Sequence, residues 1–161
     1  MQLLSNLSRK LETVSEWLLY VLLLVMVITT FLQVFFRYVI FYSLPWSEEV
    51  SRYALVWLTF IGASYGLKRG IHVAVEALVQ ALPLPAGLKR GLKALSYVLM
   101  SLLGLILLLY GAKLAQVNMG QLSPSLHIPI GLAYTALPVG GLTMLIHALA
   151  CLLEQKKEVE G

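Results

Sequence analysis

Three ionisable residues close together in the sequence, Glu48, Glu49 and Arg52, are the first candidates for chemistry in this chain. Residues three and four positions apart lie on one face of a helix, so both carboxylates are predicted to reach the same guanidinium. Because one arginine cannot neutralise two carboxylates, Arg37 at the end of the preceding apolar segment is the expected second cation. Residue types of this kind serve ion coupling or assembly, and an interfacial turn in headgroup water is the alternative.

The depth of this cluster follows from the segment behind it. Only about 15 residues, 53–67, follow without a charge. At 1.5 Å per residue this run is shorter than the roughly 30 Å hydrocarbon core of a bilayer. The cluster is therefore expected in or near the membrane, where ionisable groups are costly unless they are paired.

The composition places the whole chain in a membrane. Of its 161 residues, 59% are apolar and 12% are charged, which is typical of an integral membrane protein without a separate soluble domain. The net charge of +4 does not indicate a nucleic-acid partner, because the basic residues flank the apolar segments as topology signals do. A single cysteine, Cys151, excludes an intramolecular disulfide.

The apolar segments predict an all-α fold, with one membrane domain over residues 1–161. Four transmembrane helices are expected, at about 17–36, 46–67, 94–115 and 130–153. Two shorter amphipathic segments predict helices in the interface plane, an N-terminal one at about 3–14 and another between spans two and three at about 71–82. Pro138, followed by Gly140 and Gly141, predicts a kink within the fourth span.

The distribution of Lys and Arg predicts the orientation. Nine of them lie on the side of both termini and the middle loop, and two lie on the other side, with Arg52 inside its helix. By the positive-inside rule both termini are cytoplasmic, and the cluster of Glu48, Glu49 and Arg52 faces the other side of the membrane.

Small residues predict where helices pack closely. In the second span these are Gly62, Ala63 and Gly66, and in the third they are Gly104 and Gly111. Small side chains let helix backbones approach one another in lipid, where helix association depends on packing rather than on the hydrophobic effect.

Several kinds of chemistry have no pattern in the sequence. No hydrolytic triad, phosphate-binding loop or CxxC pair is found, so no catalytic residue and no cofactor are predicted. His72 and Glu76 are four apart but lack further ligands nearby, so no metal site is predicted. Among the histidines only His147 falls in a predicted span, whereas haem would need histidines in facing spans. No span carries a charge near its centre, where an ion-coupled carrier places one.

The order of motifs resembles one known family. Trp46 to Tyr53 reads W-S-E-E-V-S-R-Y, and it is followed by Gly62-Ala63, by Arg69-Gly70-Ile71-His72, and by Ser123-Pro124 and Ile128-Pro129 before the last span. This pattern is similar to the small membrane subunit of tripartite ATP-independent periplasmic (TRAP) transporters. The motif residues of that family fall here on Trp46, Glu48, Glu49, Arg52, Gly62, Ala63, Arg69, Gly70 and His72.

The resemblance implies a function that the residues alone do not state. It implies a non-catalytic scaffold in a bacterial inner membrane, bound to a larger elevator-type subunit that carries sodium and an organic acid. A periplasmic binding protein would deliver that acid, and membrane lipids would surround the complex. Two other classes stay open: a small homo-oligomeric four-span exporter with Glu48 or Glu49 as its coupling acid, and a haem-binding membrane anchor of a redox complex.

Overall fold

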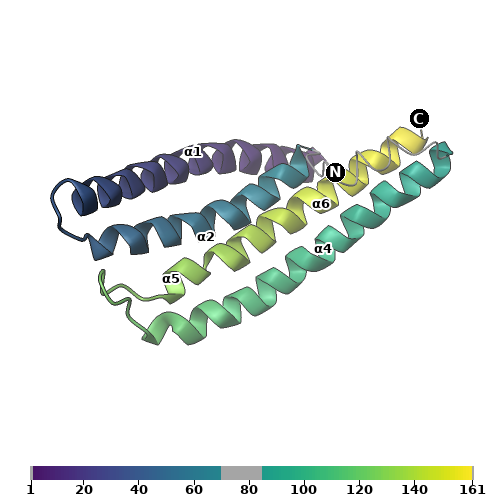
Figure 1. Cartoon of the computed structure of the whole chain (residues 1–161). Coiled ribbons are helices and arrows are strands. Elements are labelled where there is room, and N and C mark those ends of the chain that lie inside the picture. Colours follow the sequence, from purple (N-terminus) through teal and green to yellow (C-terminus); the bar gives the residue numbers. More distant parts are fainter. Residues whose placement is uncertain (1, 70–84, 161) are drawn as a thin grey trace.

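The computed structural model describes residues 2–69 and 85–160, and these residues form long antiparallel helices (Figure 1). The long helices are α1 (Gln2–Tyr38), α2 (Pro45–Lys68), α4 (Ala86–Val117) and α6 (Ala136–Glu160). A 3₁₀ turn, η1 (Asn118–Gly120), and a short helix, α5 (Gly131–Tyr134), flank the loop between α4 and α6. The all-α prediction is confirmed. The predicted interfacial helix at 71–82, with Gly70 and His72, lies outside the described residues.

The helices lie in the spatial order α1, α2, α6, α4. α2 packs against α1 and α6, and α6 packs against α2 and α4, with a smaller contact to α1. Within the described ranges, α1 and α4 make no contact with each other. The fold is therefore an open row with two free edges, as Figure 1 shows, and not a bundle closed around a central space.

Three described segments are long and apolar enough to cross a membrane: Asn6–Tyr38, Gly87–Gly120 and Gly131–Leu153. α2 is not among them, although its 24 residues extend over about 36 Å. Its first two turns carry the charges of Glu48, Glu49 and Arg52, which lower its hydropathy. The count of four spans therefore stays a prediction.

The N-terminal region differs from the prediction. A separate interfacial helix at 3–14 was expected, but the structure has one continuous 37-residue helix from Gln2 to Tyr38. No proline or glycine interrupts this stretch. Three of its polar residues, Ser8, Glu12 and Glu16, contact α2 or α6, whereas Arg9 and Lys10 are exposed. Part of the polar pattern thus marks contacts with other helices of the same chain.

The predicted break in the last span lies at Thr135, between α5 and α6. The backbone is helical on both sides, because Thr135 N–H donates to Gly131 O and Val139 N–H donates to Thr135 O. Pro138 has no N–H to donate to Tyr134 O, four residues before it, so the proline interrupts the helical hydrogen bonds one turn ahead of its own position. Gly140 and Gly141 follow within the regular helix and lie against neighbouring helices.

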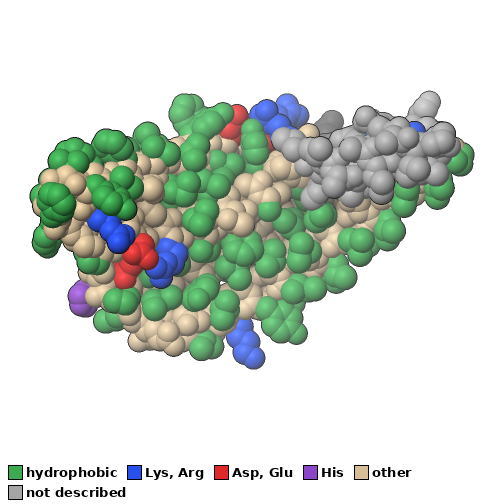
Figure 2. Space-filling model, in the orientation of Figure 1, with side chains coloured by type: hydrophobic (Ala, Val, Ile, Leu, Met, Phe, Trp, Pro, Cys, Tyr) green, Lys and Arg blue, Asp and Glu red, His purple; other side chains and the backbone are tan. Residues whose placement is uncertain are grey.

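The most buried apolar cluster lies where α2, α4 and α6 meet near the chain termini. It consists of Leu67, Met144 and Ala148, with Tyr97 and Met100 packed against it. Outside such contacts, α1 and α4 expose many large apolar side chains, and green side chains cover much of the face in Figure 2. Apolar surface of this extent is suited to lipid or to a membrane-embedded partner.

Candidate functional site

Glu48 and Arg52 form an ion pair in the first two turns of α2. Arg52 Nη2 donates to Glu48 Oε1 at 2.7 Å, and the two side chains remain about two-thirds exposed, at 64% for Arg52 and 60% for Glu48. The carboxylate also lies at the helix N-terminus, where the helix dipole favours a negative charge. The spacing of four residues alone accounts for this pair.

Glu49 has a different partner from the one that the sequence suggested. It does not share Arg52; its Oε1 accepts the N–H of Ser125 and its Oε2 accepts the N–H of Leu126, both at 3.0 Å. The residue is only 7% exposed. A buried carboxylate that receives two backbone N–H groups is compensated by dipoles, so it needs no second cation.

The loop that receives Glu49, residues 121–130, is held in a narrow turn. Ile130 N–H donates to Gln121 O at 2.8 Å and Ser123 N–H donates to Ile128 O at 2.9 Å. His127 has a φ of 54°, a left-handed conformation that reverses the chain. This geometry leaves the N–H groups of Ser125 and Leu126 free of loop partners and directed at α2.

Arg37 and Trp46 lie at the same end of the molecule, which we call the loop end because it holds the α1–α2 connection and loop 121–130 (Figure 1). Arg37 is exposed in the last turn of α1 and makes no ion pair with any described residue. Its predicted role as the second cation is therefore not seen, because backbone dipoles compensate Glu49. Trp46 is 39% exposed in the first turn of α2.

The glycines predicted for helix packing divide into two groups. A Cβ on Gly104 would lie 2.9 Å from Gly141 O, and a Cβ on Gly111 would lie 2.7 Å from Leu137 Cβ, so both lie against α6. A Cβ on Gly62 would meet Leu19 of α1 at 3.7 Å, an ordinary contact. In contrast, Gly66 has no neighbour within 4 Å of that position, and Ala63 is exposed.

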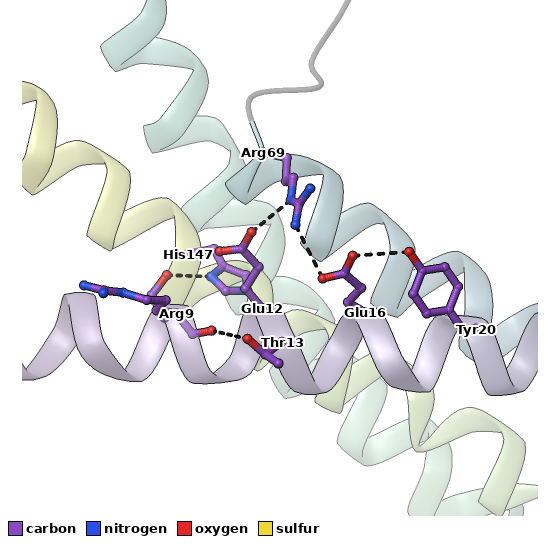
Figure 3. A network of polar contacts seen from close by, with 8 residues as sticks. Arg9, Glu12, Thr13, Glu16, Tyr20, Arg69 and His147 are labelled. Carbon is purple, nitrogen blue, oxygen red and sulfur yellow. Dashed lines mark hydrogen bonds and ion pairs between the residues drawn. The ribbon is translucent and has the colours of Figure 1, made fainter.

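At the opposite end, Arg69 joins α2 to the N-terminal part of α1 (Figure 3). Its Nε donates to Glu12 at 2.9 Å, its Nη2 donates to Glu16 at 3.4 Å, and its guanidinium lies 5.1 Å from the centre of the Tyr65 ring. The hydrogen bond to Glu12, together with the charges nearby, raises the pKa of Arg69. Both ion pairs are partly exposed, so water screens them and each is expected to contribute little to stability.

A buried hydrogen bond near this cluster fixes α1 to α6. Ser8 Oγ and His147 Nδ1 are 2.8 Å apart, and both residues are fully buried. His147 Nε2 has no hydrogen-bond partner among the described residues. Sequence reasoning missed this pair, since a lone serine and a lone histidine 139 positions apart carry no pattern.

The comparisons with known proteins decide the family. Residues 26–158 match the family model of the DctQ component of tripartite ATP-independent periplasmic transporters. The chain belongs to this TRAP small permease family. This confirms the resemblance based on the motifs between Trp46 and His72.

Individual relatives agree with the family match. A TRAP transporter small permease protein of Haemophilus influenzae is 32% identical over 141 residues, which cover 87% of this chain and 86% of the relative. The ectoine TRAP transporter small permease protein TeaB of Halomonas elongata is 30% identical over 139 residues, covering 85% and 69%. The C4-dicarboxylate TRAP transporter small permease protein DctQ of Rhodobacter capsulatus is 31% identical over 107 residues, covering 63% and 45%.

The loop end of this TRAP small permease subunit contains a cavity of about 400 Å³. The cavity lies between α2, loop 121–130 and α5, and Glu48, Glu49 and Arg52 line it together with apolar side chains. The carboxylate of Glu49 holds loop 121–130 against α2, and both elements form the wall of the cavity. The described residues contain no group of three His, Cys, Asp or Glu side chains placed to hold a metal ion.

Proposed function

We propose that this chain is the non-catalytic scaffold of a TRAP importer, in which it holds the larger elevator-type membrane subunit in place. In this proposal sodium drives the uptake of an organic acid, and a periplasmic binding protein delivers that acid. The chain would cross the bacterial inner membrane four times with both termini in the cytoplasm. Glu48, Arg52 and loop 121–130 would then face the periplasm.

The open row of helices is the observation that carries the scaffold role. A solute pathway needs an enclosure, but α1 and α4 are edges that do not meet within the described part of the chain. The apolar side chains that they expose extend over most of their length, from Trp17 to Tyr38 and from Leu88 to Val117. A flat structure with apolar edges widens a larger membrane protein without forming a channel of its own.

The charges at the two ends support the same orientation. Arg69 lies at the end of the molecule that holds both chain termini (Figure 1). Lysine and arginine concentrate on the cytoplasmic side of membrane proteins. The Glu48–Arg52 pair is at the opposite end of the same helix, and therefore on the periplasmic side in this proposal.

The transported acid is expected to depend on the other subunits. One similar relative is named for C4-dicarboxylates and another for ectoine, which are different chemical classes. These two relatives are 31% and 30% identical to this chain, yet their names give different substrates. This fits a small subunit that does not line the substrate site.

Co-purification tests the proposal. The tagged chain, expressed with the proteins encoded beside it, is expected to retain a large multi-span protein in detergent, and the pair is expected to take up solute in vesicles only together. A chain that forms a transport-competent homo-oligomer by itself would contradict the scaffold role and support a small exporter.

A single substitution probes the charged turn. Arg52→Ala removes the partner of Glu48 and is expected to reduce the yield of the complex and the rate of uptake several-fold, since an uncompensated charge near lipid is costly. Lys113→Ala is the matched control, because Lys113 is also an exposed cation on the same side of the membrane. Normal assembly and uptake in Arg52→Ala would show that the turn with Glu48 and Arg52 is not needed for either.

A further inference from the structure

The Glu48–Arg52 pair lies at the depth of phospholipid headgroups if α2 crosses the membrane. Arg52 and Lys68 are 16 positions apart on one helix, which at 1.5 Å per residue is about 24 Å, and Glu48 and Lys68 are 20 positions apart, about 30 Å. The hydrocarbon core is roughly 30 Å thick. With Lys68 at one membrane surface, Glu48 lies at about the opposite surface and Arg52 about 6 Å below it, so the exposed atoms of the pair lie where headgroups meet acyl chains.

The cavity beside the pair has the shape of an amphiphile site. Glu48 and Arg52 lie in its wall at the first two turns of α2, and Val56, Ile130 and Ala133 continue the wall with apolar side chains. The wall of this cavity of about 400 Å³ therefore contains both charged and apolar side chains. A molecule with a charged headgroup and an apolar tail can use both.

The unused atoms of the pair define the polar end of that molecule. Only Nη2 of Arg52 and Oε1 of Glu48 are used in the contacts among the described residues. The other guanidinium N–H groups and the second carboxylate oxygen remain available. Together they offer donors to an anionic oxygen and an acceptor to a cationic N–H group, side by side.

We propose that this cavity binds the headgroup of an ethanolamine phospholipid. The phosphate accepts hydrogen bonds from Arg52, and the primary ammonium donates to Glu48, so that the two zwitterions lie antiparallel. The first part of an acyl chain follows Val56 and Ala133 between α2 and α5. This site does not depend on the role of the chain in transport, because it is built from described residues of this chain alone.

The chemistry separates this headgroup from other common ones. Choline carries the same charge as ethanolamine but has no N–H to donate, so it loses the hydrogen bond to Glu48. Glycerol is neutral, so it brings no second cation to Glu48, whose carboxylate then has only Arg52 as its partner. The selectivity for ethanolamine therefore resides in Glu48, and the affinity for any phospholipid resides in Arg52.

Native mass spectrometry of the full-length chain in detergent tests the proposal, with phosphatidylethanolamine, phosphatidylcholine and phosphatidylglycerol of the same acyl composition. The chain is expected to retain phosphatidylethanolamine about tenfold better than phosphatidylcholine, the value of one charge-assisted hydrogen bond. Glu48→Gln is expected to abolish this preference, and Arg52→Gln to weaken all three lipids. Lys113→Gln, an exposed cation outside the cavity, should bind like the unmodified chain.

Several outcomes would overturn the proposal. These are equal retention of the ethanolamine and choline lipids, a preference for phosphatidylglycerol, or an unchanged preference in Glu48→Gln. If Arg52→Gln does not fold, Glu48→Gln still decides, because it changes only the charge of an exposed side chain. A photoreactive residue at position 55, one turn below the pair, is expected to label phospholipid in cells; labelling of protein alone would show that a partner covers the pair.

Discussion

The helices α4 and α6 approach closely at Gly104 and Gly141, and filling this contact is expected to separate them. A Cβ added to Gly141 would lie 2.7 Å from Gly104 O, 2.7 Å from Leu108 N and 2.9 Å from Leu107 Cβ. Two of these neighbours are backbone atoms of a regular helix, which cannot turn away as a side chain does. Gly141→Ala therefore requires α4 to move by about 0.7 Å to reach an ordinary contact of 3.4 Å.

The expected magnitude is the difference between two opposing terms. Overpacking a well-packed contact costs about 1–3 kcal/mol. Replacing glycine by alanine in a helix returns up to about 1 kcal/mol of helix propensity. The net loss is about 0–2 kcal/mol, toward the upper value because two of the neighbours are backbone atoms, and at about 2–4 °C per kcal/mol it lowers the melting temperature by up to several degrees.

Cys151 makes the assay direct. It is the only cysteine of the chain and it is buried in α6, ten residues from Gly141. A thiol-reactive fluorophore therefore reports the exposure of α6 as the purified protein is heated. Gly141→Ala is expected to move this transition to lower temperature.

Gly66→Ala is the matched control, since Gly66 also lies in a helix but has no neighbour within 4 Å of the new Cβ. This variant is expected to melt at the same temperature as the unmodified protein or slightly above it. If Gly141→Ala melts no lower than Gly66→Ala, the close backbone contact between α4 and α6 is refuted.

Two further substitutions test the buried polar contacts. Glu49→Gln removes the charge that receives the N–H groups of Ser125 and Leu126, and hydrogen bonds to a charged group are stronger than those to a neutral one. Amide hydrogen exchange of Ser125 and Leu126 is expected to accelerate at least tenfold. The control variant Glu48→Gln should leave their exchange rates unchanged. Equal rates in the two variants would contradict the hydrogen bonds between Glu49 and loop 121–130. Ser8→Ala leaves the buried histidine of α6 with both ring nitrogens unpaired, which costs about 1–3 kcal/mol, and it should lower the melting temperature more than Ser8→Thr.

The helices of this protein were largely predictable because membrane insertion imposes a strong local pattern. Long apolar runs, Pro45 at a helix start and the charges beside each run indicated α1, α2, α4 and α6. The bounds of α2 are within one residue of those predicted, whereas α1 and α4 begin 15 and 8 residues earlier than expected. The separate helix predicted at 3–14 is part of α1. Its polar residues Ser8, Glu12 and Glu16 contact other helices, which the amphipathic pattern alone does not show. Its position in the membrane interface stays a prediction.

The charged turn was predictable only in part. Glu48 and Arg52 are four positions apart, and helix geometry alone brings them together. Glu49 has the same residue type and nearly the same position, yet its partners are 76 and 77 positions away. The sequence offered Arg37 as a cation because charges are visible in a sequence, whereas unpaired backbone N–H groups are not.

By itself the sequence determined the all-helical membrane character, the pairing of Glu48 with Arg52 and the family pattern from Trp46 onward. Each of these depends on residues that are close along the chain or on composition. The tertiary structure decided the order of the helices, the docking of the N-terminal part of α1 on α2 and α6, and the link between Glu49 and loop 121–130. The physical reason is that periodicity shows which face of a helix is polar, small or apolar, but not which of several similar helices will cover that face.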